Sequence, residues 1–145
     1  MVQLIIDGMI NAASPMNLLF MFIGLVAGAV IGCLPGLSAT MAMAILVPFT
    51  FTMDPATGLV MLGAIFMGAM FGGSVSAILL NTPGTPAAVA TTFDGYPMTE
   101  QGKSKEALIG AAAASSFGGF IGAIMLLVLT PPLASAALKF GPPEY

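Results

Sequence analysis

The chain has 145 residues, of which 58% are hydrophobic and only 6% are charged, and its mean hydropathy is +1.04. Because soluble domains carry roughly 25% charged residues and disordered chains need charge and polarity, this composition excludes both classes and predicts an integral membrane protein. The net charge of −3 and the absence of Arg and His exclude a nucleic-acid partner and any His-based metal centre or nucleophile.

Charged residues divide the chain into three long uncharged stretches, residues 8–53, 55–93 and 107–138. A helix that spans the hydrocarbon core needs about 20 residues. The first two stretches are too long for one span and too short for three, so each is expected to fold back inside the membrane. The third is expected to form one long tilted span, or a span followed by a surface segment.

In chain order, the apolar runs predict an all-α integral membrane protein, a polytopic helix bundle with broken or re-entrant helices. Pro15 is typical of a helix start, and Pro131-Pro132 is typical of a helix stop. The hydrophilic segment 94–106 is expected to be an extramembrane loop, whose two lysines favour the cytoplasmic side. The expected helices cover residues 16–34, 39–51, 56–80 and 107–129.

Small residues recur at every fourth position on three of these expected helices, and residues four apart share one helix face. In lipid, helices associate through the close backbone approach that such residues allow. The spacing therefore predicts dense helix packing, and it weakly suggests an internal repeat. The three stripes are Gly24, Gly28 and Gly32, then Ala64, Gly68 and Gly72, then Gly110, Ala114, Gly118 and Gly122.

Two interruptions fall inside the uncharged stretches, one at residues 35–40 and one at residues 81–86. Proline removes a backbone N–H and glycine permits tight turns, so the two together stop a helix. An unpaired backbone group in hydrocarbon costs several kcal/mol, so irregular backbone at that depth must be buried by protein or reached by water. A kinked or re-entrant geometry is expected just before the second interruption. The residues expected to shape the backbone are Pro35, Gly36, Gly72, Gly73, Pro83, Gly84 and Pro86.

Small hydroxyl and amide side chains gather at both interruptions and are the candidate binding residues. Broken helix ends direct N–H groups and a partial positive charge at a cavity, which suits an anion, while exposed oxygens suit Na⁺. With no Arg present, an anion site would depend on backbone dipoles, hydroxyls and a co-bound cation. The alternative is that one or both interruptions are ordinary loops at the membrane surface, since their residues are common in turns. The candidates are Ser38, Thr40, Ser74, Asn81, Thr82 and Thr85.

The residues around these interruptions resemble the large membrane subunit of the tripartite tricarboxylate transporters, the TctA family. The similar segments are 32–62, 63–107 and 140–145, and the run 68–86 is the most specific. The resemblance implies a bacterial inner-membrane carrier for citrate or related carboxylates, driven by a gradient of Na⁺ or H⁺ and moving by an elevator-like mechanism. It implies three partners besides the lipid bilayer: the carboxylate substrate, a small membrane subunit and a periplasmic solute-binding protein. It also implies that the two interruptions, with Ser74, are the substrate and ion regions.

Large subunits of this family are several times longer and have two related halves. Residues 1–145 are therefore expected to be the N-terminal membrane region of a longer two-repeat protein, or a split gene product. Two rival functions are a passive membrane channel and a non-transporting structural fragment. An enzyme is not expected, because no pair of intramembrane carboxylates is available for acid–base chemistry. No catalytic residue, no cofactor and no metal other than Na⁺ as a coupling ion is expected.

Overall fold

A computed structural model describes residues 2–137, and every regular element in that range is a helix. The predicted all-α helix bundle is confirmed. The chain divides into two compact units after Ala111. In chain order the elements are α1 (Val2–Ala12), α2 (Pro15–Gly32), α3 (Ala39–Thr50), α4 (Pro55–Leu80), the short 3-10 helix η1 (Pro86–Ala88), α5 (Val89–Glu100) and α6 (Ser104–Ala137).

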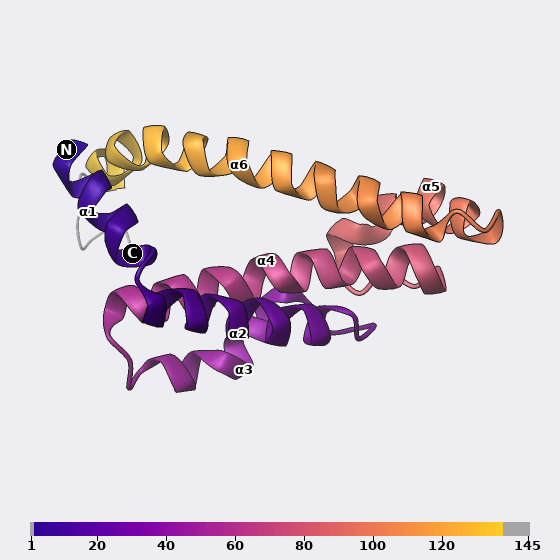
Figure 1. Ribbon diagram of the computed structural model, residues 1–145, viewed down its shortest axis with the longest axis horizontal. Helices are drawn as coiled ribbons and strands as arrows, with labels where there is room; N and C mark the ends of the chain where they lie inside the picture. Colours follow the sequence, from indigo (N-terminus) through magenta and orange to yellow (C-terminus); the bar gives the residue numbers. More distant parts are fainter. Residues whose placement is uncertain (1, 138–145) are drawn as a thin grey trace. The chain divides into compact units, whose positions relative to one another are not determined.

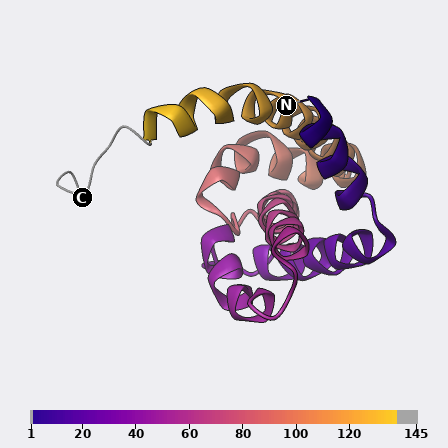
Figure 2. The ribbon, with the colours of Figure 1, turned by 90° about the vertical axis from the view of Figure 1, so that its left-hand side faces the viewer.

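Helix α4 lies at the centre of the first unit, and Figure 2 shows it end-on with α2, α3 and α5 around it. Helices α2 and α4 lie side by side in Figure 1 and run parallel, because Gly24 lies against Met61 and Gly32 lies against Ala69. Helix α3 runs back in the opposite direction, so that its end at Thr50 lies beside the beginning of α4. A parallel pair joined by a returning helix therefore forms the framework of this unit.

The glycine stripes of α2 and α4 bring the two backbones into contact. A Cβ atom added at Gly28 would overlap the carbonyl of Ile65 and lie 2.9 Å from its Cα atom. Close backbone approach of this kind is the main source of helix association in lipid. The first two predicted stripes thus pack against each other. Within residues 112–137, a Cβ added at Gly118 or Gly122 meets no atom, so dense packing of the third stripe stays a prediction.

Helices α2, α3 and α4 each begin at a side chain that accepts a hydrogen bond from a backbone N–H in the first turn. Pro15 and Pro55 occupy the position after such a cap, where the missing N–H would have had no partner in any case. The predicted helix start at Pro15 is confirmed. The capping residues are Ser14, Ser38 and Asp54.

The predicted helix stop at Pro131-Pro132 is wrong, because α6 continues through both prolines to Ala137. Two side-chain hydroxyls near the prolines also bond carbonyl groups of this helix. Thr130 Oγ1 donates to the carbonyl of Leu126 at 2.6 Å, and a serine one turn later donates to the carbonyl of Pro132 at 2.8 Å. Internal prolines are more frequent in apolar membrane helices than in helices of soluble proteins.

The prediction that residues 94–106 form a loop is also wrong, since helix α5 extends through most of this segment. Contacts with α4 stabilise this helix. Gly95 packs against Ile78, and Thr99 Oγ1 donates to the carbonyl of Ile78 at 2.8 Å. Helix α5 ends at a tight turn in which Gly102 has a φ of +76°. The tertiary contacts outweigh the weak helix propensity of this hydrophilic stretch.

A cluster of polar side chains ties the beginning of α2 to α4. Asn17 is only 3% exposed, and its Nδ2 donates to the carbonyl and to Oδ1 of Asn11 at 2.7 and 2.8 Å. Thr57 Oγ1 donates to Asn17 Oδ1 at 2.6 Å. The buried amide therefore has partners for both its oxygen and its nitrogen, which removes the cost of burying it.

We expect Thr57→Val to lower the free energy of unfolding by about 1–2 kcal/mol, because Asn17 Oδ1 would lose its donor while staying buried. Thr52→Val is the matched control, since Thr52 is exposed and its hydroxyl bonds only the carbonyl of Phe49 nearby. Thermal unfolding of the detergent-purified subunit measures both. Equal stabilities of the two variants would contradict a structural role for this cluster.

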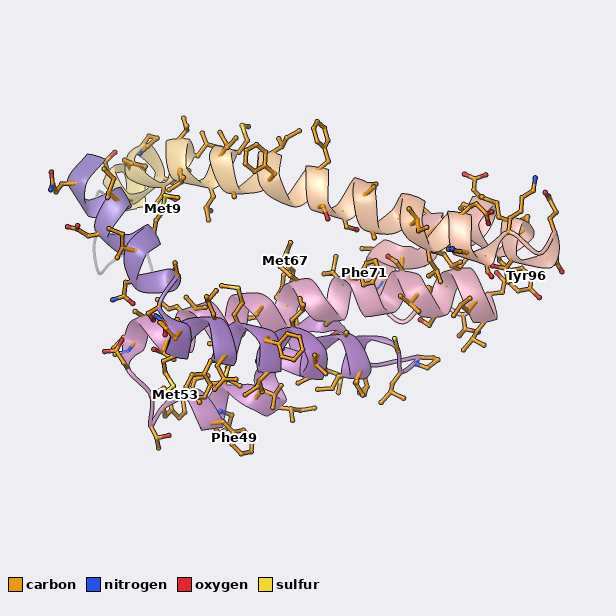
Figure 3. All side chains as sticks on the ribbon, in the orientation of Figure 1. Met9, Phe49, Met53, Met67, Phe71 and Tyr96 are labelled. Atoms are coloured by element: carbon orange, nitrogen blue, oxygen red, sulfur yellow. The ribbon has the colours of Figure 1, made fainter. Side chains whose placement is uncertain are left out.

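Among residues 2–137, three helices are long and apolar enough to cross a membrane: α2, α4 and residues 104–135 of α6. Helix α3 is apolar but shorter. Large apolar side chains of the first unit point outward, including Phe49 on α3, which is 62% exposed, and Met67 on α4 (Figure 3). A surface of this kind belongs in lipid rather than in water. The chain is thus a multi-pass membrane protein.

Candidate functional site

The first interruption lies between α2 and α3 and ends at the cap of α3. The backbone turns after Gly32, and Gly36 adopts a φ of +92°, a conformation that glycine permits. Ser38 Oγ accepts a hydrogen bond from the N–H of Met41 at 3.2 Å and pairs with the hydroxyl of Thr40 at 2.7 Å. The two hydroxyls therefore lie at the N-terminus of α3, where a helix carries a partial positive charge.

The second interruption folds back along the helix that precedes it. Asn81 ends α4 in the left-handed conformation, with a φ of +55°. The chain then reverses, so that the N–H of Gly84 donates to the carbonyl of Gly73 at 3.4 Å. Leu80 is seven residues beyond Gly73, which is about 10 Å along a helix. Segment 81–86 is thus re-entrant relative to α4, and α5 leads the chain out again.

A pocket of about 270 Å³ joins the two interruptions, which are far apart in the sequence. Ligand pockets run from roughly 300 to 1,000 Å³, so this one suits a small ligand or one part of a larger ligand. None of its lining side chains is ionisable, and Ser38 brings the N-terminus of α3 to its wall. The lining residues are Gly36, Ser38, Pro83, Gly84, Thr85, Pro86 and Val89.

Gly84 is packed tightly where the two interruptions meet. A Cβ atom added there would overlap the carbonyl oxygen of Gly32 and lie 2.9 Å from both Gly73 Cα and Ser76 Oγ. Gly73 is equally close to the segment, because a Cβ added there would lie 2.7 Å from Thr85 Oγ1. Only glycine fits at either position without displacing backbone.

Thr85 carries a buried hydroxyl that has no hydrogen-bond partner. The residue is 3% exposed, and Oγ1 has neither a donor nor an acceptor among the described residues. Most buried polar groups in proteins are paired, so an exception of this kind indicates a water, an ion or a ligand group. The carbonyl oxygen of Gly32, on the other side of Gly84, also accepts no hydrogen bond within residues 2–137.

Other expected binding residues lie outside this pocket. Asn81 and Thr82 are exposed, and the hydroxyl of Thr82 donates to the carbonyl of Leu80 at 3.1 Å. Ser74 Oγ bonds the carbonyl of Met70 in its own helix at 3.4 Å. The side chain of Thr40 reaches the site only through Ser38. The structure thus brings Ser38 and Thr85 together and leaves the other four candidates outside the lining.

The expected backbone-shaping residues are divided in the same way. Gly36, Pro83, Gly84 and Pro86 line the pocket, while the exposed Pro35 lies in the turn before it. Helix α4 is one continuous helix from Pro55 to Leu80, and the re-entrant alternative of the expected kinked or re-entrant geometry begins directly after it, at Asn81. Two other glycines of this set pack closely against neighbouring segments. They are Gly72, which lies against Ala29 of α2, and Gly73, which lies against Thr85.

One residue of the site was not among the candidates. Ser76 is 3% exposed, and its Oγ donates to the carbonyl of Gly73 at 3.0 Å beside Gly84. It lies inside an apolar helix, where a serine is easily taken for one more small packing residue. Its spacing could have identified it, because Ser76 lies four residues after Gly72 and so shares the helix face of Gly68 and Gly72.

Comparison with known proteins adds a family match over most of the chain. The Tripartite tricarboxylate transporter TctA family matches residues 18–145. The chain is 45% identical over 138 residues to an uncharacterized 52.8 kDa protein in the TAR-I ttuC' 3' region of Agrobacterium vitis. The alignment covers 95% of this chain but only 28% of that protein. No solved structure matches the chain.

Proposed function

The chain belongs to the tripartite tricarboxylate transporter TctA family, and we propose that it supplies a carboxylate-binding pocket to an ion-coupled transporter. One observation carries the proposal: two interrupted helices far apart in sequence meet at one pocket, with the N-terminus of α3 at its wall. Interrupted helices that direct N–H groups at an anionic substrate are typical of secondary transporters.

The first turn of α3 provides the donors for a carboxylate. Ser38 Oγ accepts a hydrogen bond from the N–H of Met41. The N–H groups of Ala39 and Thr40 therefore remain for a ligand. Together with the helix dipole, these groups attract negative charge without any Arg or Lys. Because the pocket is small, we infer that it holds one carboxylate group of a tricarboxylate such as citrate, while the rest of the subunit holds the remainder.

The transporter context follows from the same proposal. The full assembly contains a small membrane subunit and a periplasmic solute-binding protein that delivers the carboxylate, and it lies in the bacterial inner membrane. Uptake is driven by a cation gradient. The chain covers 28% of its curated relative, so we assign it one part of the substrate site.

The test uses a pair of substitutions that keep the cap of α3 but differ in charge. Asp and Asn both cap helices well. Ser38→Asp places a carboxylate in the pocket, and we expect it to weaken citrate binding at least about 10-fold through like-charge repulsion at low dielectric. Ser38→Asn adds no charge and should bind within a few-fold of the parent. Binding is measured calorimetrically on the complete membrane subunit.

Thr82→Asp is the control for charge outside the pocket, because Thr82 is exposed and lies outside the lining. It should bind like the parent. Equal loss in Ser38→Asp and Ser38→Asn, or none in either, would contradict a carboxylate at this helix end. In proteoliposomes, saturable and gradient-dependent uptake distinguishes the carrier from a channel, and no citrate-dependent stabilisation would indicate a structural fragment.

A further inference from the structure

We propose that the first unit binds one phospholipid with an ammonium headgroup, such as phosphatidylethanolamine, at the end where α2 and α4 begin. An acyl chain of this lipid lies in an apolar groove between the two helices, and the headgroup lies in a polar pocket at the mouth of the groove. Neither the groove nor the polar pocket shares a lining residue with the carboxylate pocket, so the lipid site is independent of the function proposed above.

The groove has a volume of about 550 Å³, and the described residues that line it are all apolar. On α2 it extends from Leu18 to Leu25, and on α4 it extends from Leu59 to Met67. A Cβ atom added at Gly63, in the middle of the α4 side, meets no atom within 4 Å, so the groove is open there. Because both helices are long and apolar enough to cross a membrane, the groove takes an apolar occupant from within the bilayer.

The depth of the groove matches one leaflet of a bilayer. Helices α2 and α4 run parallel, so both depths are measured from the same end. Leu25 lies about 15 Å along α2 from Pro15, and Met67 lies about 18 Å along α4 from Pro55. Half of the hydrocarbon core is also about 15 Å. An acyl chain ends at this depth, whereas a spanning helix of a partner would follow a groove across the whole core.

The side chains that line the groove also favour a chain over a helix. Met21 and Phe22 line it from α2, and Met67, which points outward in Figure 3, lines it from α4. Helices in lipid associate closely through small residues, and only Gly63 and Ala64 of the lining are small. Methionine side chains are flexible and fill irregular gaps, which suits a flexible acyl chain.

A polar pocket of about 280 Å³ adjoins the groove, because Val60 lines both. Asp7 and Asn11 of α1 contribute its polar side chains, and Ala56 lies on the α4 side. The Oδ1 atom of Asn11 accepts a hydrogen bond from Asn17 at 2.8 Å, so the nitrogen of the Asn11 amide is the group left to donate to a phosphate. The carboxylate of Asp7 can accept hydrogen bonds from an ammonium group.

The charges of the first unit select the headgroup. Asp7 and Asp54 are both acidic and lie near the beginnings of α2 and α4. The two lysines among residues 2–137, Lys103 and Lys105, follow α5, which packs on the other end of α4. An anionic lipid would be repelled at the acidic end, while an ammonium headgroup is complementary to it. Since lipid tails are all equally apolar, the groove provides the fit and the headgroup provides the selectivity.

Native mass spectrometry of the complete membrane subunit, with the subunits that copurify with it, measures the bound lipid. Phosphatidylethanolamine and phosphatidylglycerol with identical acyl chains are added in turn. We expect the parent to bind phosphatidylethanolamine at least about 3-fold more tightly, as one partly exposed ion pair provides. Asp7→Asn should remove this preference. Asp54→Asn is the matched control, because asparagine also caps a helix and Asp54 lines neither the groove nor the polar pocket.

Gly63→Leu tests the groove. The leucine side chain would occupy the open space, and we expect the binding of both lipids to weaken at least about 10-fold through overpacking. Val30→Phe adds bulk at a position of α2 that is 61% exposed and outside the groove, and it should bind lipid like the parent. If Gly63→Leu does not fold, Val60→Phe replaces it, because Val60 lies where the groove meets the polar pocket.

Equal affinity of the parent for the two lipids, or a preference that persists in Asp7→Asn, would overturn the proposal. Unchanged lipid binding in the folded groove variant would also contradict it. Loss of a copurified protein subunit from Gly63→Leu, with no lipid lost, would show that a partner helix occupies the groove instead. Citrate binding by the complete subunit is a separate measurement, so failure of the lipid site leaves the carboxylate pocket standing.

Discussion

Gly84→Ala should abolish high-affinity citrate binding by the complete subunit. The added methyl group would overlap the carbonyl oxygen of Gly32 and approach Gly73 Cα and Ser76 Oγ to 2.9 Å. Two of these neighbours are backbone, so relief requires the re-entrant segment to leave α4. Overpacking of this kind costs about 1–3 kcal/mol or more, and we expect citrate affinity to fall at least about 10-fold. Calorimetric titration with citrate measures it.

Gly8→Ala is the control for the exchange of glycine by alanine, because a Cβ at Gly8 meets no atom within 4 Å. It should bind citrate like the parent. The melting temperature of Gly84→Ala should fall only a little, since α2 and α4 keep their own contacts. Its citrate affinity should fall strongly. Parental affinity in Gly84→Ala would show that the segment is not docked between Gly32 and Gly73 in the binding-competent state.

Gly28→Ala should destabilise the first unit more than any exchange at an outward-facing glycine. The added methyl group would overlap the carbonyl of Ile65 and lie 2.9 Å from its Cα atom, so the helix axes must separate. Separation loses contacts along the whole α2–α4 interface, and backbone proximity is what associates helices in lipid. We expect a loss of about 2–3 kcal/mol in unfolding free energy, measured by thermal unfolding in detergent.

Gly63→Ala is the matched control on the partner helix, where a Cβ meets no atom within 4 Å. It should leave stability unchanged or raise it by up to about 1 kcal/mol, because alanine favours helix over glycine. If Gly28→Ala were as stable as Gly63→Ala, the parallel packing of α2 on α4 would be disproved.

The apolar helices and the packing of two glycine stripes could be predicted because both follow from local pattern. A run of about 20 apolar residues has no favourable place outside the bilayer core, and small residues four apart define a face. The helical state of residues 94–100 could not be predicted, because it depends on contacts of Gly95 and Thr99 with Ile78. The continuation of α6 through Pro131 could not be predicted either, because proline is a helix breaker in water but is tolerated inside apolar membrane helices.

The candidate site was predictable in kind but only partly in residues. Proline and glycine at 35–36 and 83–84 mark where helices stop, and this is a property of each residue. The meeting of the two interruptions is a long-range contact that no local pattern contains. Burial then separates the polar residues, since Thr85 turns inward against Gly73 while Asn81 and Thr82 face outward.

The parallel pairing of α2 and α4 has a consequence for biosynthesis. Helix α2 leaves the ribosome with its glycine face uncovered, and the matching face arrives only after α3 has been made and has turned back. Closing the chain between α2 and α4 costs little additional entropy, but the contact between these two helices forms late. Until residue 72 has entered the bilayer, lipid or an insertion chaperone must cover the glycine face of α2 that α4 later covers.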